Sequence, residues 1–144
     1  MRKLAVDVGQ SRIGLAISEG SLALPLEVID AKQEAFRQVL EIARGRGVVA
    51  IYVGLPLSLG GSFTPSTTKA IEFAKGLAEE FEVRMIDERL TTKSAQSRLR
   101  ESGKNSKQSR GIVDAQAAAL ILEFALQSER DGALSGKAIG DLDV

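Results

Sequence analysis

An unbroken apolar run between two helical patterns is the feature that most limits how this chain can fold. The run is VVAIYVGLP at residues 48–56, rich in β-branched side chains and closed by Gly-Leu-Pro. A strand that is apolar on both faces is typical of a central parallel strand, which helices cover on both sides. The chain has 144 residues, 44% of them hydrophobic, which is enough for one domain with a buried core. The run therefore predicts a single α/β domain.

The segments around this run predict the other elements of a mixed sheet. Residues 3–8 and 13–18 have the pattern of two strands joined by a tight Gly-Gln-Ser-Arg connection, which indicates a hairpin. Residues 22–29 can add a third strand, where Pro25 indicates an edge position or a bulge. Apolar periodicity and capping residues predict a short strand at 82–86 and helices at 32–44, 65–81, about 92–101 and 112–127.

Two stretches have neither a strand nor a helix pattern. Residues 102–110 are polar and contain glycine, which predicts a loop, and the Gly- and Asp-rich segment 129–144 predicts a flexible tail. The expected organisation is one domain over 1–128 followed by this tail. No apolar run is long enough for a membrane span, and the N-terminus reaches Asp7 too soon for the core of a signal peptide. A cytoplasmic protein is expected, and the absence of cysteine agrees with a reducing compartment.

Three acidic motifs carry the candidate chemistry, because the chain contains no histidine and no cysteine. Without these residues there is no Ser–His or Cys–His nucleophile pair, no imidazole base and no zinc site of the usual kind. Carboxylate oxygen remains, and it is the ligand type that suits Mg²⁺ or Mn²⁺. The candidate catalytic and metal-binding residues are Asp7 in DVGQSRIGLA, Glu88 in DERLTT and Asp114 in VDAQAAALIL.

Strand geometry allows two of these acids to meet, provided that their strands lie near each other. Asp7 closes the first strand and Glu88 follows the strand at 82–86, and the carboxyl ends of parallel strands share one edge of a sheet. Asp114 begins a helix whose place the pattern does not give. Each acid also has a structural alternative: Asp7 as a turn residue, Glu88 as a partner of Arg89 with Asp87 as the competing acid, and Asp114 as a charge at a helix N-terminus.

A basic segment is the candidate contact for a phosphate backbone. Residues 98–110 contain five basic residues and a single acid, Glu101, in a chain whose 19 basic and 19 acidic residues balance. The alternative is an ordinary solvated loop. Aromatic residues make up only 4% of the chain, so sequence-specific readout through base stacking is not expected. The candidate nucleic-acid contacts are Arg12, Arg98, Lys104, Lys107 and Arg110, with Arg100 in the same patch.

Four motifs in order, DVGQSRIGLA, VGLPLSLGGS, DERLTT and VDAQAAALIL, resemble the YqgF (RuvX) family over roughly residues 2–127. This is a family of Holliday junction resolvase-like proteins, also described as nucleases of pre-16S rRNA. The resemblance implies an RNase H-like fold, with a five-stranded mixed sheet whose first three strands are antiparallel and helices on both faces. It also implies that Asp7, Glu88 and Asp114 converge on divalent metal. Gly60 departs from the family pattern, which often has an acid there.

The expected function is that of a metal-dependent endonuclease acting on structured nucleic acid. In a two-metal scheme Asp7 would bridge the ions, with Glu88 and Asp114 completing the site. The resemblance implies processing of the 16S rRNA precursor, Holliday junction resolution, or both, by a monomer or a homodimer. Two other classes stay open: a non-catalytic factor that binds RNA or polymerase, and a phosphotransferase of the actin and hexokinase kind. The second would need two such hairpin lobes, and the hairpin occurs once.

Overall fold

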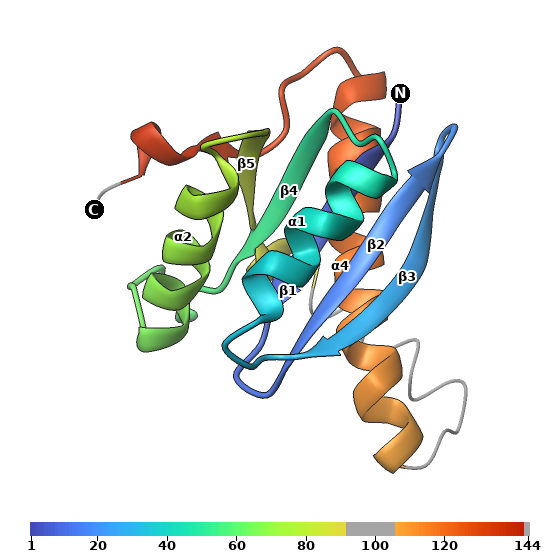
Figure 1. Ribbon diagram of the computed structural model, residues 1–144. Coiled ribbons are helices and arrows are strands. Elements are labelled where there is room, and N and C mark those ends of the chain that lie inside the picture. The colour runs from blue at the N-terminus through green and yellow to red at the C-terminus, as the bar shows by residue number, and fades with distance from the viewer. Residues whose placement is uncertain (92–105, 143–144) are drawn as a thin grey trace.

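The computed structural model describes the backbone of residues 1–91 and 106–142, and the side chains of these residues apart from 106–114. Three strands lead the chain, and helices and strands then alternate (Figure 1). The elements in chain order are β1 (Lys3–Val8), β2 (Arg12–Glu19), β3 (Leu22–Asp30), α1 (Ala35–Gly45), β4 (Ala50–Leu55), α2 (Pro65–Leu77), β5 (Glu82–Asp87), η1 (Glu88–Leu90), α4 (Ser106–Arg130), β6 (Lys137–Ala138) and η2 (Ile139–Asp141).

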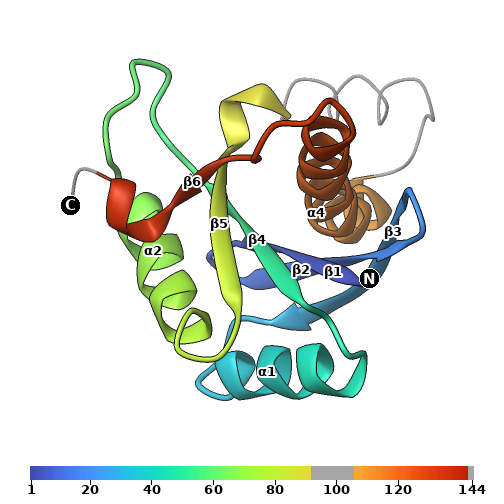
Figure 2. The ribbon, with the colours of Figure 1, turned by 90° about the horizontal axis from the view of Figure 1, so that it is seen from above.

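The strands form one mixed sheet in the order β3-β2-β1-β4-β5-β6. β1, β2 and β3 are antiparallel, whereas β4 lies parallel to both β1 and β5. The predicted α/β fold with three antiparallel leading strands is confirmed. The prediction of five strands is wrong, because β6 adds to the free edge of β5 in antiparallel orientation (Figure 2).

Helices cover both faces of the sheet, as predicted. α1 and α2 lie on one face and α4 on the other (Figure 2). The molecule has a hydrophobic core on each face of the sheet, and successive strand residues point into different cores. Val53 packs on the side of α1 and α2, whereas Tyr52 packs with Ile121 and Leu122 of α4. β4 is buried along its whole length, which explains its unbroken apolar sequence.

The two edges of the sheet are closed by different local features. At the β3 edge, the register with β2 shifts between Leu15 and Ala16, and Pro25 lies opposite Ala16. Proline has no N–H to donate to a ladder, so the edge strand with a bulge predicted for it is confirmed. At the other edge, the Arg84 guanidinium donates to the carbonyl oxygens of Ser135 and Gly136, the latter at 2.7 Å, and holds β6 beside β5.

Two helices begin or end at other residues than the sequence predicts. Thr64 caps α2 and Pro65 begins it, as predicted, but α2 ends at Leu77 rather than near 81. α4 begins at Ser106 rather than at 112, so part of the predicted loop 102–110 is helical. Its first residues are polar and give no apolar periodicity, which is why the pattern does not predict them. The helix predicted at about 92–101 lies outside the described residues.

A polar contact fixes the C-terminal end of α4 on the sheet. The Glu129 carboxylate accepts hydrogen bonds from the Lys3 ammonium of β1 and the Tyr52 hydroxyl of β4. Burial, followed by this carboxylate, raises the pKa of Tyr52, so the phenol stays a donor. The division into a domain over 1–128 and a tail over 129–144 stays a prediction, although residues 137–141 form β6 and η2. No helix in the described part of the chain is long and apolar enough to cross a membrane.

Candidate active site

Asp7 and Glu88 meet at the carboxyl edge of the sheet, although β4 lies between their strands. Asp7 is near the end of β1, and Glu88 is the first residue after β5. Gly54 of β4 provides the room for this approach: a Cβ on Gly54 would lie 2.9 Å from both the Cδ and an Oε atom of Glu88, and 2.8 Å from Ile121 of α4. Only glycine lets the Glu88 side chain cross over β4 towards Asp7.

Burial and mutual contact shift the acid–base behaviour of this pair. The two carboxyl groups are hydrogen-bonded to each other. Burial, then the contact with Asp7 and its charge, raises the pKa of Glu88 to about 9. Burial also raises the pKa of Asp7. Two carboxylates held together out of water cannot both ionise easily, so the pair retains a proton at neutral pH.

The pair has the chemistry of a divalent metal site. A cation would replace the shared proton and relieve the repulsion between two carboxylates, and their oxygen atoms suit Mg²⁺ or Mn²⁺. No group of three or more acidic, histidine or cysteine side chains that could hold a metal occurs among the side chains the structure describes. Asp114 lies on α4, the helix over this face, but its side chain is outside that set. Its convergence with Asp7 and Glu88 stays a prediction.

The raised pKa values predict how stability depends on pH in EDTA. The folded protein binds more protons than the unfolded chain between the ordinary glutamate pKa of 4.5 and the Glu88 pKa of about 9. The free energy of unfolding should therefore fall as pH rises through this window, by at least about 1 kcal/mol. Urea titrations at a series of pH values measure it. Glu88→Gln should flatten the decline, and an equal slope in both proteins would contradict a coupled pair.

Asp87 has a different role from its neighbour: it ends β5 and caps η1, and its side chain accepts from the backbone N–H of Arg89 at 2.9 Å. Its carboxylate accepts from the Arg89 guanidinium, with Nη2 at 2.6 Å and Nε at 3.0 Å. Hydrogen bonding to Arg89 lowers the pKa of Asp87 below its usual value. The Arg89 partner is therefore Asp87, and Glu88 faces Asp7 instead.

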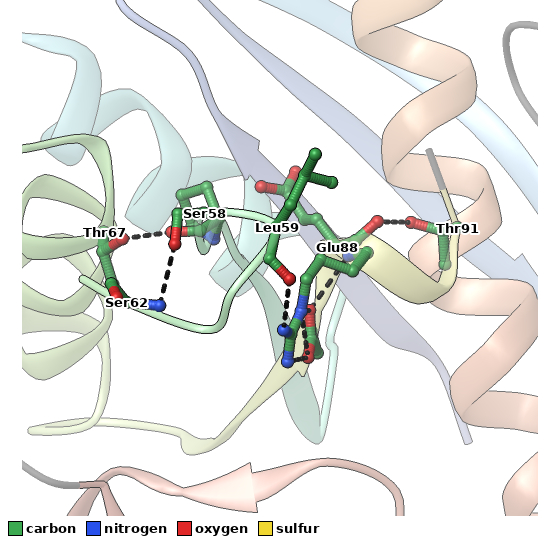
Figure 3. A network of polar contacts seen from close by, with 9 residues as sticks. Ser58, Leu59, Ser62, Thr67, Glu88 and Thr91 are labelled. Carbon is green, nitrogen blue, oxygen red and sulfur yellow. Dashed lines mark hydrogen bonds and ion pairs between the residues drawn. The ribbon is translucent and has the colours of Figure 1, made fainter. Parts of the chain in front are cut away.

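Arg89 also ties the loop 57–63 to η1, and Figure 3 draws Leu59, Glu88 and Thr91 of this network. Its Nη1 atom lies 3.3 Å from the carbonyl oxygen of Leu59, and the backbone of Glu88 accepts from the Thr91 hydroxyl at 3.3 Å. The other end of the loop is fixed by the Thr67 hydroxyl, which donates to the carbonyl of Pro56. A Cβ added at Gly60 would have no atom within 4 Å, so this position has room for a side chain.

The candidate phosphate contacts are only partly described. Arg12 begins β2, and its carbonyl accepts from the N–H of Gly9 at 2.9 Å to close the hairpin beside Asp7. Arg98 and Lys104 lie outside the described residues. Lys107 and Arg110 lie in the first turns of α4, but their side chains are not described. Their contact with nucleic acid stays a prediction.

Two residues of the site have no signal of their own in the sequence. Gly54 reads as the end of a buried strand, and Lys69 reads as a polar residue of a helix. In the structure the Lys69 ammonium lies 3.4 Å from the carbonyl of Gly9 and 3.5 Å from that of Gln10. A positive charge from α2 therefore lies at the turn of the hairpin that contains Asp7.

The fold of this chain is similar to that of a known resolvase. RuvC of Thermus thermophilus superposes with a TM-score of 0.57, over 94% of this chain and 99% of that one, at 17% identity. The same protein in complex with a Holliday junction substrate gives 0.56 at 18% identity. At such identities the likeness shows the fold alone, which is that of the RuvC-like resolvases.

Sequence comparison then identifies the family. The family model RuvX, described as Holliday junction resolvase, matches residues 1–128. A protein of Leifsonia xyli named "Putative pre-16S rRNA nuclease" is 48% identical over 134 residues, 89% of this chain and 86% of the relative. A Streptomyces avermitilis protein of the same name is 41% identical over 97% of this chain and 92% of the relative. The chain belongs to the RuvX family, whose members carry nuclease names.

Proposed function

We propose that this protein is a metal-dependent endonuclease that cuts structured RNA, acting in the cytoplasm on the 5′ end of the 16S rRNA precursor. The observation that carries the proposal is the buried Asp7–Glu88 pair at the carboxyl edge of the sheet. The names of relatives that are more than 40% identical favour ribosomal precursor RNA. The description of the family model favours a second candidate substrate, the four-way DNA junction.

The side chains of this site have separable tasks in such a reaction. Asp7 and Glu88 would hold Mg²⁺ or Mn²⁺, with Asp114 as the third ligand from α4. A divalent ion bound there would activate water and neutralise charge on the phosphate and the leaving oxygen. Gly54 gives Glu88 its position, and Arg89 and Thr91 hold the backbone around it. Arg12 and Lys69 lie where a phosphate backbone would approach the hairpin.

A nuclease assay tests this proposal against the alternative of a non-catalytic binding factor. The purified protein is incubated with ribosomal precursor RNA or with four-way DNA junctions, in Mg²⁺, in Mn²⁺ and in EDTA. Cleavage of the RNA at a defined position with either ion, and none in EDTA, is expected. Tight binding of the RNA without cleavage under any ion would favour the binding factor, and cleavage of the junction alone would favour the second substrate.

The basic segment should contribute to binding without contributing to turnover. Replacing both Lys104 and Lys107 with Ala should flatten the salt dependence of binding by roughly one unit of log–log slope per lost phosphate contact. The rate at saturating substrate should change little, because neither residue is a candidate metal ligand. Affinity is measured for RNA and junction DNA over a salt series. Lys32→Ala combined with Lys75→Ala is the control with equal charge loss. If the salt dependence of binding had the same slope in both double variants, Arg12 and Lys69 would become the candidate phosphate contacts instead.

A further inference from the structure

A pocket of about 610 Å³ lies at the ends of β4 and β5, and neither Asp7 nor Glu88 lines it. Five parts of the chain line it: the end of β4, the loop 57–63, the end of β5 with η1, α4 at Phe124, and the C-terminal segment around β6 and η2. Leu55, which follows Gly54, lines it, and so do Asp87 and Arg89 on either side of Glu88. The volume is within the range of about 300–1,000 Å³ that small-ligand sites occupy.

The lining combines half-exposed apolar side chains with charged ones. Phe63 lines the pocket with 40% of its surface exposed, and Leu90 does so with 59% exposed. An antiparallel bridge between Leu57 and Phe63 closes the loop and fixes the Phe63 backbone. Two basic residues, Arg89 and Lys137, and two acids, Asp87 and Asp141, also line the pocket, and Arg89 is paired with Asp87. Exposed aromatic surface next to cationic side chains is the combination that binds an unpaired base and its phosphate.

The C-terminal wall of this pocket is held in place by its own contacts. Gly136 lines the pocket with a φ of +67°, and a Cβ there would collide with the carbonyl oxygen of Met85. Arg84 binds the carbonyls before β6, and Leu142 packs against the core. The family model ends at residue 128, so this wall lies beyond the residues it matches.

We propose that this pocket holds an unpaired nucleobase of the strand that is cut, next to the phosphate at Asp7 and Glu88. The base stacks on Phe63, and Lys137 faces the adjoining phosphate. The proposal rests on the proposed function, because it is the acid pair that places a phosphate beside the pocket. It names the substrate class more closely: a structured nucleic acid with an unpaired nucleotide beside the cut.

Titration of the four ribonucleoside 5′-monophosphates into ¹⁵N-labelled protein in EDTA tests the pocket without the reaction. The amide signals of Gly61 and Gly136, which belong to two different walls, should shift together and saturate with at least one nucleotide. Phe63→Ala should weaken this binding about tenfold. Phe63→Leu, which keeps apolar volume at a half-exposed position, should weaken it similarly and guards against a folding defect. Leu134→Ala, a change at a residue that is 77% exposed on the same C-terminal segment, should leave binding unchanged.

The pocket and the proposed nuclease activity can fail separately. Asp7→Asn should retain nucleotide binding in EDTA, because Asp7 does not line the pocket. Absence of shifts at Gly61 and Gly136 with all four nucleotides, or equal affinity in the wild type and both Phe63 variants, would overturn the base pocket whatever the cleavage assay shows. Nucleotide binding with no cleavage of either substrate would support the pocket and overturn the proposed nuclease.

Discussion

Asp7→Asn is expected to lower metal-dependent cleavage by about a thousandfold or more, without unfolding the protein. The substitution keeps the size of the side chain but removes one of two charges that would hold the ion. A bound divalent ion supplies several kcal/mol of transition-state stabilisation, which the variant should lose. It should also abolish the rise in melting temperature that Mg²⁺ or Mn²⁺ gives to the wild type, because that rise reflects binding to the folded state alone. Cleavage rates and melting curves with and without metal measure both effects.

A matched control for this prediction is Asp131→Asn, which removes an exposed acid near the far end of α4. Asp131 accepts from the Gln127 side chain at 3.2 Å and has no contact with the acid pair. Its activity and metal-induced stabilisation should equal those of the wild type. Full metal-dependent cleavage by Asp7→Asn would show that the active site lies elsewhere.

Glu88→Gln is expected to cost activity by orders of magnitude, whereas Asp87→Asn should cost less than about tenfold. Glu88 contacts Asp7, and its neutral analogue can still fill the space over Gly54, so the loss would be one of charge rather than of packing. Asp87 is bound to Arg89, and its loss should loosen the loop 57–63 instead.

Steady-state kinetics separate these two substitutions. Glu88→Gln should lower kcat, whereas Asp87→Asn should act mainly on KM through the loop. The reverse order of losses would mean that Asp87 is the metal ligand and Glu88 the structural residue, with the metal mechanism otherwise intact.

The placement of Asp7 and Glu88 at one edge of the sheet is predictable, because strand direction follows from patterns that the sequence displays. Two hairpin strands, a run that is apolar on both faces and a short strand after a helix define which ends share an edge. The way in which the acids meet is not predictable in the same manner. It depends on Gly54, whose lack of a side chain matters only because Glu88 and Ile121 both approach it from distant parts of the chain.

The features that the sequence does not predict are set by tertiary contacts. β6 has only two residues, too few for a periodic pattern, and its pairing depends on Arg84 and on the backbone of Gly136. The choice of Asp87 rather than Glu88 as the partner of Arg89 follows from where β5 ends and η1 begins, and this requires the strand end to be known. The early start of α4 at Ser106 lies in polar sequence that a loop would display equally well.

The central claim is that Asp7 and Glu88 together bind the divalent ion that cleavage requires. Anomalous diffraction from crystals prepared with Mn²⁺, at a concentration that supports cleavage in solution, tests it most directly. We predict anomalous density in contact with carboxylate oxygens of both residues, with the hydrogen bond between the two side chains replaced by bonds to the metal. Crystals that show no such density, with Asp7 and Glu88 still hydrogen-bonded to each other, would contradict the account.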